Sequence, residues 1–162
     1  MEKKDVKKGS VSAIFISRAK GTGRERISSG VFRENHGLEG DAWSGPGDRQ
    51  VVILTQEVRQ AVENDSRKGI CFSRFKETLQ IRGVPADLIE KGTRMSIGEV
   101  LIEVSRKGKS CFPDCEIVQS GSICAMKKNA LFARILQTGQ ISEGDSVILL
   151  GTKHDECASS LI

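Results

Sequence analysis

The chain has 162 residues, of which 28% are charged and 38% hydrophobic, and its formal net charge is +4. This length suits one domain, and the hydrophobic fraction is sufficient for a folded core. No stretch approaches ~20 apolar residues and the Lys-rich start lacks the apolar segment of a secretory signal, so we expect a cytoplasmic protein without a membrane partner. Six Phe, one Trp and no Tyr offer few surfaces for base stacking, and we do not expect nucleic-acid binding.

The first third of the chain alternates between apolar segments and loops. Residues 11–17 (VSAIFIS) and 50–54 (QVVIL) are short, apolar and rich in β-branched residues, which is typical of buried strands. Residues 18–29 form a basic loop. Residues 36–48 are rich in glycine and contain Pro46, so we expect no regular element there.

The middle of the chain begins with a predicted helix over residues 56–64. Thr55 can cap this helix, and its apolar residues recur at helical spacing on one narrow face. Residues 75–81 (FKETLQI) alternate like a half-buried strand. Glu77 lies on the apolar side of that pattern, where a carboxylate without a partner is costly.

The last part of the chain predicts four further elements. A short helix is expected near residues 86–90, followed by a hairpin of residues 95–97 and 99–105. Residues 129–137 carry apolar side chains in a pattern that we interpret as helical, and residues 146–150 read as a last strand.

Strands therefore outnumber helices, and they do not alternate with helices in a regular order. This predicts a mainly β fold, a predominantly antiparallel β-barrel or sandwich with a few short helices. We expect the domain to span residues 10–150, between a mobile tail (1–9) and a polar C-terminal tail (151–162).

Cysteine is the unusual feature of the composition. The odd count and the missing export signal argue against a disulfide framework. Three cysteines lie between positions 111 and 124, just after Arg106, Lys107 and Lys109, whose positive charge favours thiolate. A reactive or ligating thiol, reduced structural cysteines and a zinc site lacking its fourth ligand all fit this stretch. The five cysteines are Cys71, Cys111, Cys115, Cys124 and Cys157.

Three other features are candidates for a site. The glycine-rich loop can expose backbone amides to a phosphate or oxyanion, or it is a structural surface loop. Glu77 needs a partner such as Arg49 or a backbone amide, and a structural ion pair explains it better than a catalytic acid. His36 adjoins the glycine-rich loop and is either a ligand, a base or a solvated side chain.

Taken in order, these segments resemble the MOSC domain, named after the C-terminal domain of molybdenum cofactor sulfurase, and most of all its small stand-alone bacterial members. The resemblance extends over about residues 10–150. The segments that carry it are residues 11–14 (VSAI), 36–42 (HGLEGDA), 49–51 (RQV), 75–79 (FKETL), 92–98 (GTRMSIG), 108–115 (GKSCFPDC), 131–136 (LFARIL) and 144–145 (GD).

The resemblance implies a bent, barrel-like β-sheet that binds the molybdenum–pterin cofactor or carries sulfur to metal–sulfur centres. Cys115 best matches the family cysteine that forms a persulfide or ligates molybdenum, and Cys111 is a second thiol able to resolve the persulfide as a disulfide. Basic side chains would neutralise the cofactor phosphate, with Arg18, Arg49, Arg106 and Lys109 as candidates. The positions expected to bind cofactor are Gly40, Asp41, Arg49, Gln50, Glu77 and Lys109.

The sequence departs from the family pattern at Trp43, where many relatives have histidine, and at Thr78, where the family has asparagine. We expect the domain to receive sulfur or cofactor from a cysteine desulfurase-type donor or to serve a molybdenum cofactor enzyme. Pyridoxal phosphate belongs to the partner domain of full-length sulfurases, and we do not expect it here. The alternatives to a sulfur-transferase-like carrier are a molybdenum-dependent reductase of N-hydroxylated compounds and a non-catalytic module stabilised by zinc.

Overall fold

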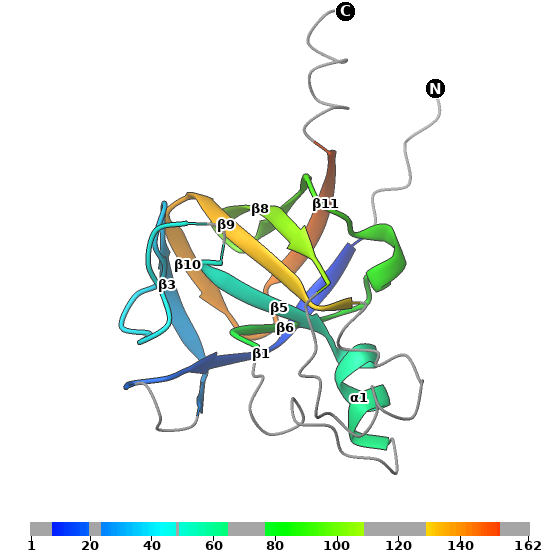
Figure 1. The fold of residues 1–162 in the computed structure, drawn as a ribbon, viewed down its shortest axis with the longest axis horizontal. Coiled ribbons are helices and arrows are strands. Elements are labelled where there is room, and N and C mark those ends of the chain that lie inside the picture. The colour runs from blue at the N-terminus through cyan, green and yellow to red at the C-terminus, as the bar shows by residue number, and fades with distance from the viewer. Residues whose placement is uncertain (1–7, 20–23, 48, 65–76, 109–128, 153–162) are drawn as a thin grey trace, which may run out of the picture.

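The computed structural model describes residues 8–19, 24–47, 49–64, 77–108 and 129–152 (Figure 1). Strands dominate these residues, with one α-helix and one short 3-10 helix. The elements in chain order are β1 (Lys8–Ile16), β2 (Glu25–Ile27), β3 (Ser29–Arg33), β4 (Gly37–Leu38), β5 (Val51–Thr55), α1 (Gln56–Asn64), β6 (Leu79–Arg82), η1 (Ala86–Leu88), β7 (Thr93–Ile97), β8 (Val100–Lys107), β9 (Leu131–Gln137), β10 (Gly139–Ser142) and β11 (Ser146–Thr152).

Seven strands close into a barrel in the order β11-β7-β8-β9-β5-β6-β1, and the pairing of β1 with β11 completes the ring. The expected mainly β, barrel-like fold is confirmed. One pair, β5 with β6, is parallel. Parallel neighbours need a crossover connection, and α1 lies in that connection. β2 pairs with the end of β1, while β10, β3 and β4 form a small second sheet.

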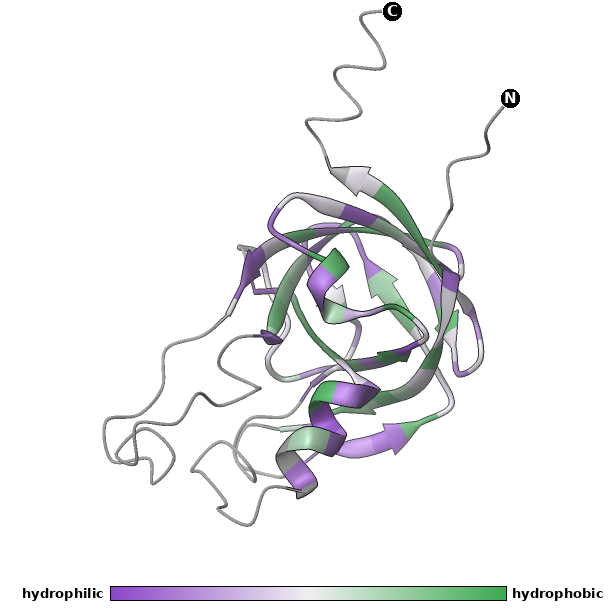
Figure 2. Cartoon of the chain, turned by 90° about the vertical axis from the view of Figure 1, so that its right-hand side faces the viewer, coloured by the Kyte–Doolittle hydropathy of each residue, from purple (hydrophilic) through white to green (hydrophobic). Residues whose placement is uncertain are grey.

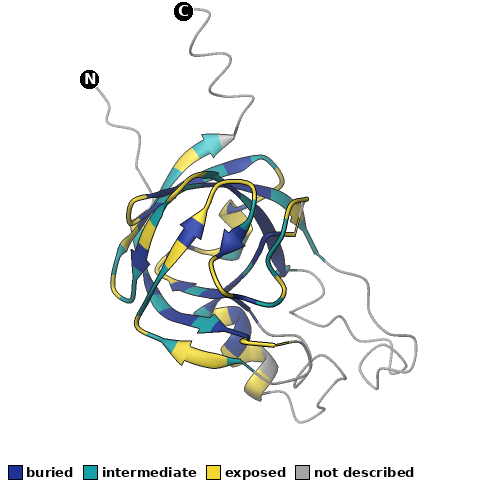
Figure 3. Cartoon of the chain, turned by 90° about the vertical axis from the view of Figure 1, so that its left-hand side faces the viewer, coloured by how far each residue is buried: buried dark blue, intermediate teal, exposed yellow. Residues whose placement is uncertain are grey.

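The hydrophobic core fills the barrel, whose strands Figure 2 shows as a ring. Along β7, Thr93, Met95 and Ile97 are buried and the residues between them are only partly so, as the period of two of a strand requires. Figure 3 shows the same change between buried and more exposed residues along other barrel strands. The largest fully buried side chains are Ile14, Phe32, Leu38, Ile53, Leu54, Leu79, Ile81, Ile89, Met95, Ile97 and Ile102.

The helix expected at residues 129–137 is wrong, because this segment forms strand β9. Leu131, Ala133 and Ile135 are buried at a spacing of two, and β9 pairs with β8 on one side and with β5 on the other. The backbone of β9 forms hydrogen bonds with strands on both sides. This tertiary pairing stabilises the strand more than the weak helical spacing of the apolar residues favours a helix.

Other expected elements agree with the structure. The helix at residues 56–64 is α1, and the hydroxyl of Thr55 accepts a hydrogen bond from the backbone N–H of Val58 at 3.3 Å. The hairpin is formed by β7 and β8, and it turns at Gly98, which has a φ of 57°. A Cβ at Gly98 would collide with the carboxylate of Asp145, so only glycine fits this turn.

The loops contain strands that were not expected. β2 begins inside the predicted basic loop, and Gly37–Leu38 forms the two-residue strand β4 inside the glycine-rich segment. The short helix expected near residues 86–90 is the single 3-10 turn η1. The strand expected at residues 75–81 corresponds to β6, which begins at Leu79, and the described part of this segment starts at Glu77. In the part of the chain that the structure describes, no helix has the length and apolar character needed to cross a bilayer.

Leu79→Ala tests the importance of the closed core. Leu79 is fully buried in β6 between β1 and β5, and its truncation should lower the free energy of unfolding by about 2–5 kcal/mol. Leu150→Ala makes the same chemical change at a side chain that is 54% exposed, and should change stability by no more than about 0.5 kcal/mol. Urea unfolding measures both, and equal losses would contradict this core.

Candidate functional site

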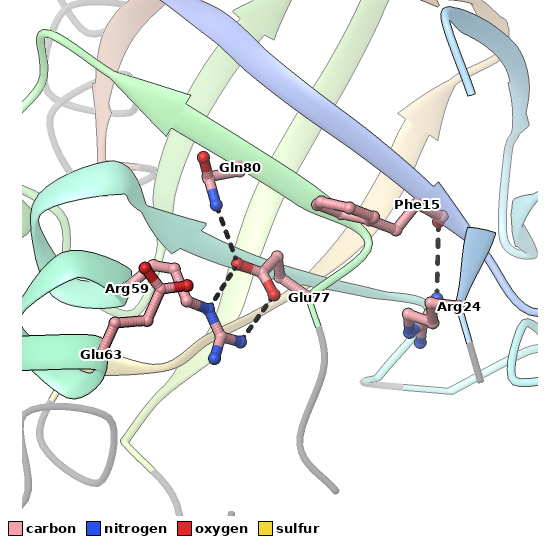
Figure 4. Close-up of a pocket in the computed structure, with 6 residues that line it drawn as sticks. All are labelled: Phe15, Arg24, Arg59, Glu63, Glu77 and Gln80. Atoms are coloured by element: carbon pink, nitrogen blue, oxygen red, sulfur yellow. Dashed lines mark hydrogen bonds and ion pairs between the residues drawn. The ribbon is translucent and has the colours of Figure 1, made fainter. Parts of the chain in front are cut away.

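A polar cavity of about 250 Å³ lies on the outer face of the barrel, beside α1 (Figure 4). Phe15 of β1 and Gln80 of β6 form its wall and alternate in sequence with residues of the core. We call it the arginine cavity, because two arginines line it, Arg59 of α1 and Arg24 just before β2. Its lining residues are Phe15, Arg24, Arg59, Glu63, Glu77 and Gln80.

Glu77 is buried in this cavity and held by Arg59 of α1. Arg59 donates from Nη2 to Oε1 at 2.7 Å and from Nε to Oε2 at 3.1 Å, and the amide of Gln80 donates to Oε2 at 3.2 Å. The partner expected for Glu77, Arg49, lies elsewhere, with its guanidinium 4.9 Å from the centre of the Phe132 ring. The two-point contact satisfies both oxygens of Glu77, as a buried carboxylate requires.

Asp41 is the second buried carboxylate next to the cavity. Its Oδ1 accepts the backbone N–H of Ser17 at 2.8 Å and Nη1 of Arg24 at 3.3 Å. Nη1 of Arg24 also donates to the carbonyl of Phe15 at 3.5 Å. Burial lowers the pKa of Arg24, although Asp41 and Glu77 act to raise it. The buried guanidinium is therefore not fully compensated by the carboxylates around it.

The glycine-rich loop brings Asp41 to the end of β1. Gly40 has a φ of 88°, which turns the chain just before Asp41, and the N–H of Ala42 donates to the carbonyl of Ser17 at 2.7 Å. His36 lies within the same loop, where its Nε2 is 3.0 Å from the hydroxyl of Ser44. Hydrogen bonds within the loop and to the end of β1 hold the glycine-rich loop in place. The loop thereby positions the carboxylate of Asp41.

Gln50 is buried, and both the nitrogen and the oxygen of its side-chain amide form hydrogen bonds. Its amide nitrogen donates to Asn35 at 3.0 Å and to the carbonyl of Gly47 at 2.9 Å, and its oxygen accepts the N–H of Ile135 at 2.9 Å. These bonds attach the glycine-rich loop to β9. Gln50 therefore contributes to the structure of the loop, and it lines a second cavity away from Glu77.

That second cavity, of about 280 Å³, contains a charged row across three strands. Glu103 of β8 lies opposite Arg94 of β7 and Arg134 of β9, at 3.2 Å and 2.6 Å. Burial alone would raise the pKa of Glu103, but the hydrogen bonds from Arg134 and Arg94 outweigh it and lower the pKa. Such cross-strand ion pairs connect neighbouring barrel strands.

The structure separates the expected site residues into three groups. Glu77 lines the arginine cavity and Asp41, which follows Gly40 in the chain, contacts its Arg24, whereas Arg49 and Gln50 lie elsewhere. Lys109, Cys111 and Cys115 are outside the described residues, as are the other three cysteines. Within the ranges that the structure describes, no group of three His, Cys, Asp or Glu side chains could hold a metal ion.

Sequence reasoning missed Arg59 and treated Arg24 only as one residue of the basic loop 18–29. Arg59 follows Val58 at the edge of the apolar face of α1, and a basic residue at the edge of such a face is a usable signal. Nothing in the sequence distinguishes Arg24 from the neighbouring basic residues of its loop. Only the folded chain shows that its side chain is 9% exposed, while the Arg26 side chain is 60% exposed.

The buried pair of Glu77 and Arg59 predicts a double-mutant effect. Glu77→Leu removes the carboxylate that makes the two-point contact with the buried Arg59 and should reduce the free energy of unfolding by about 3–5 kcal/mol. The double variant Glu77→Leu/Arg59→Leu should recover a large part of that loss. Glu39→Leu, which breaks an exposed pair with Arg33, is the control and should cost less than about 1 kcal/mol. A double variant no more stable than Glu77→Leu would contradict the pairing.

The lowered pKa of Glu103 predicts how stability depends on pH. Because the folded-state pKa lies below the ordinary value of 4.5, ionised Glu103 stabilises the fold above pH 4.5, and this contribution is lost as the pH falls towards the folded-state pKa. Glu103→Gln should therefore show a shallower loss of stability below pH 4.5 in acid titrations followed by circular dichroism. Arg134→Met should raise the pKa of Glu103 and move the loss to higher pH; an unchanged curve in both variants would refute this assignment.

Solved structures with the same fold include bacterial proteins of low sequence identity. The YuaD protein from Bacillus subtilis superposes with a TM-score of 0.65 and 14% identity over 90% of this chain and 97% of its own. YiiM from Geobacillus stearothermophilus gives 0.60 and 19% (88% and 75% covered), and YiiM from Escherichia coli gives 0.59 and 21% (89% and 70% covered).

No protein-family model matches the sequence, and no curated protein matches it either. The structural comparison thus shows the fold and nothing finer. YuaD and YiiM are MOSC-domain proteins, and this chain has their fold.

Proposed function

We propose that this protein is a cytoplasmic MOSC-type sulfur carrier or molybdenum-cofactor-binding protein in which Cys115 is the working thiol. The observation that carries the proposal is the arginine cavity on a barrel with the fold of MOSC-domain proteins. Of the residues expected from the family pattern, Glu77 lines that cavity and Asp41 contacts its Arg24.

The described residues fit the anionic part of the molybdenum–pterin cofactor. Arg24 offers a buried guanidinium to a phosphate, and charge-assisted hydrogen bonds of this kind are among the stronger ones in proteins. Asp41 holds that guanidinium in place from one side. When bound, the cofactor would supply molybdenum, for which a cysteine thiolate is a suitable ligand.

In the carrier function, the thiolate of Cys115 attacks the outer sulfur of a persulfide on the donor protein. The new S–S bond forms on Cys115 as the S–S bond of the donor breaks, and the donor leaves as a thiolate. Delivery to an acceptor reverses these roles. In the absence of an acceptor, Cys111 attacks Sγ of Cys115, which forms a disulfide and releases hydrogen sulfide.

Cys115→Ser tests the carrier function. The test uses the Cys111→Ser background, in which no resolving disulfide can release the sulfur. Incubation with a cysteine desulfurase and free cysteine should add the mass of one sulfur atom to this variant, and the further change Cys115→Ser should abolish the gain, because a serine hydroxyl forms no persulfide. Cys157→Ser is the matched control and should keep the adduct. Intact-mass spectrometry before and after reduction measures it, and a reducible adduct on Cys115→Ser would refute the role of Cys115.

Elemental analysis of purified protein distinguishes the proposal from its rivals. Molybdenum together with a pterin, lost in Cys115→Ser, supports cofactor binding through this thiol. Stoichiometric zinc that disappears together with the folded state on chelation would instead identify a structural metal module.

A further inference from the structure

We propose that the outer side of the barrel over β7, β8 and β9 is a docking surface for an acidic segment of a partner protein. We call this surface the basic face and define it by the four arginines that share it: Arg49, Arg94, Arg106 and Arg134. The inference involves neither Cys115 nor the arginine cavity, and it goes beyond the proposed function.

Two of these arginines belong to a row of charges across three strands. Arg134 lies in β9 between Ala133 and Ile135, whose side chains belong to the core, so the side chain of Arg134 points outwards. Glu103 of β8 is in register with Arg134 on one side and with Arg94 of β7 on the other. The row Arg94, Glu103 and Arg134 therefore lies on the outer side of the sheet.

The other two arginines lie beside this row. Phe132 precedes Arg134 by two residues in β9, so both side chains lie on the same side of the strand. Arg106 of β8 is in register with Phe132, and the guanidinium of Arg49 lies 4.9 Å from the centre of its ring. Arg49 and Arg106 are both exposed. Figure 1 shows the strands concerned, β8, β9 and β5, next to one another on one side of the barrel.

The positive charges of the row lie nearer to solvent than its negative charge. The side chain of Glu103 is 8% exposed, whereas that of Arg94 is 22% and that of Arg134 is 42% exposed. The carboxylate accepts from Arg94 at 3.2 Å and from Arg134 at 2.6 Å, so one buried negative charge holds two guanidinium groups above it. A partner that approaches the row meets the guanidinium groups first.

The basic face as a whole carries more arginines than carboxylates. The sequences of β7, β8 and β9 contain one acidic residue, Glu103, and Glu34 lines the second cavity, so four arginines stand against two carboxylates. Outside the described residues, Asp48 and the segment 109–128 together contain three lysines and three acidic residues, which does not alter this balance. Charge complementarity therefore favours an acidic partner.

Three of the arginines are held in position without a partner. Glu103 holds Arg94 and Arg134, and the ring of Phe132 supports Arg49. Ordering a long side chain costs free energy when a complex forms, and a side chain that is already held loses less. Arginine is also enriched at protein interfaces, because its planar guanidinium can bind a carboxylate at two points. These properties suit the recognition of glutamate and aspartate side chains.

Two other occupants fit the basic face less well. A second copy of this chain in a two-fold dimer would place arginines against arginines, and like charges across an interface weaken binding. Single-stranded nucleic acid stacks its bases on exposed aromatic rings, whereas Phe132, the aromatic residue of β7, β8 and β9, is 4% exposed. The second cavity, with Arg94 and Arg134 in its wall, instead offers a recess to an acidic side chain.

Binding of a labelled acidic peptide to the full chain tests the proposal. The probe is a synthetic peptide of alternating glutamate and valine, whose extended form presents its carboxylates on one side, and fluorescence anisotropy measures its affinity. Wild type should bind the peptide, more weakly as the salt concentration rises. Arg49→Met and Arg134→Met should each weaken binding by about tenfold, because each removes a charge-assisted contact.

Arg26→Met is the matched control. Arg26 is an exposed arginine with a carboxylate partner, Glu143, and it lies in β2, which pairs with β1 and not with the strands of the basic face. Its replacement removes the same charge and should leave the affinity for the peptide unchanged. If Arg134→Met does not fold because Glu103 loses a donor, the exposed Arg49 decides the test through Arg49→Met.

Charge reversal distinguishes a specific surface from general attraction. Arg49→Glu/Arg106→Glu should lose the glutamate peptide and gain affinity for the same peptide with lysine in place of glutamate. Three results would overturn the proposal: no binding of the glutamate peptide to wild type, an equal loss of affinity in Arg26→Met, or tighter binding of a single-stranded oligonucleotide of the same charge through the same arginines.

The basic face and the proposed thiol function can fail separately. Cys115→Ser should bind the acidic peptide as wild type does. Peptide binding without persulfide formation in the Cys111→Ser background would refute the carrier function and leave the basic face standing. Persulfide formation without peptide binding would refute the basic face alone.

Discussion

Strand β1 pairs with three other strands, and the barrel and the candidate site both depend on those pairings. Its first residues pair with β11 and close the ring, its middle pairs with β6, and its end pairs with β2. Just after the last paired residue of β1, the backbone N–H of Ser17 donates to Asp41. Within the strand, the carbonyl of Phe15 accepts a hydrogen bond from Arg24, and Phe15 lines the arginine cavity. The backbone bonds that close the barrel therefore also place the walls of the cavity.

Among the described residues, the buried charged groups differ in how many hydrogen bonds they make. Glu77 and Glu103 each receive guanidinium donors on both oxygens, and such arrangements stabilise a fold without offering a free carboxylate to a ligand. Arg24 differs, because its contacts with the described residues are made through Nη1 alone although the side chain is buried. A buried charge held by few contacts is more typical of a binding site than of a purely structural one.

Local patterns predicted β1, β5, α1 and the hairpin of β7 and β8 correctly, because each has a clear period, a cap or a glycine turn of its own. They failed at β9, where apolar residues at positions 131, 133, 135 and 136 fit both a helix and a strand. They also misplaced the partner of Glu77, which is Arg59 and not the suggested Arg49. Arg59 meets Glu77 because the connection from β5 to β6 runs through α1. A local sequence pattern carries no information about this packing of distant segments.

The sequence by itself determined a β-rich fold, a stretch of chain with three closely spaced cysteines and a set of polar positions that resembles a known family, because periodicity, composition and motif order are properties of the chain. Only the tertiary structure decided that the barrel is closed and contains one parallel pair, and that Glu77 belongs with Arg59. It also distinguished Arg24 from the basic residues around it, because burial and hydrogen bonding arise from segments that meet only when the barrel closes.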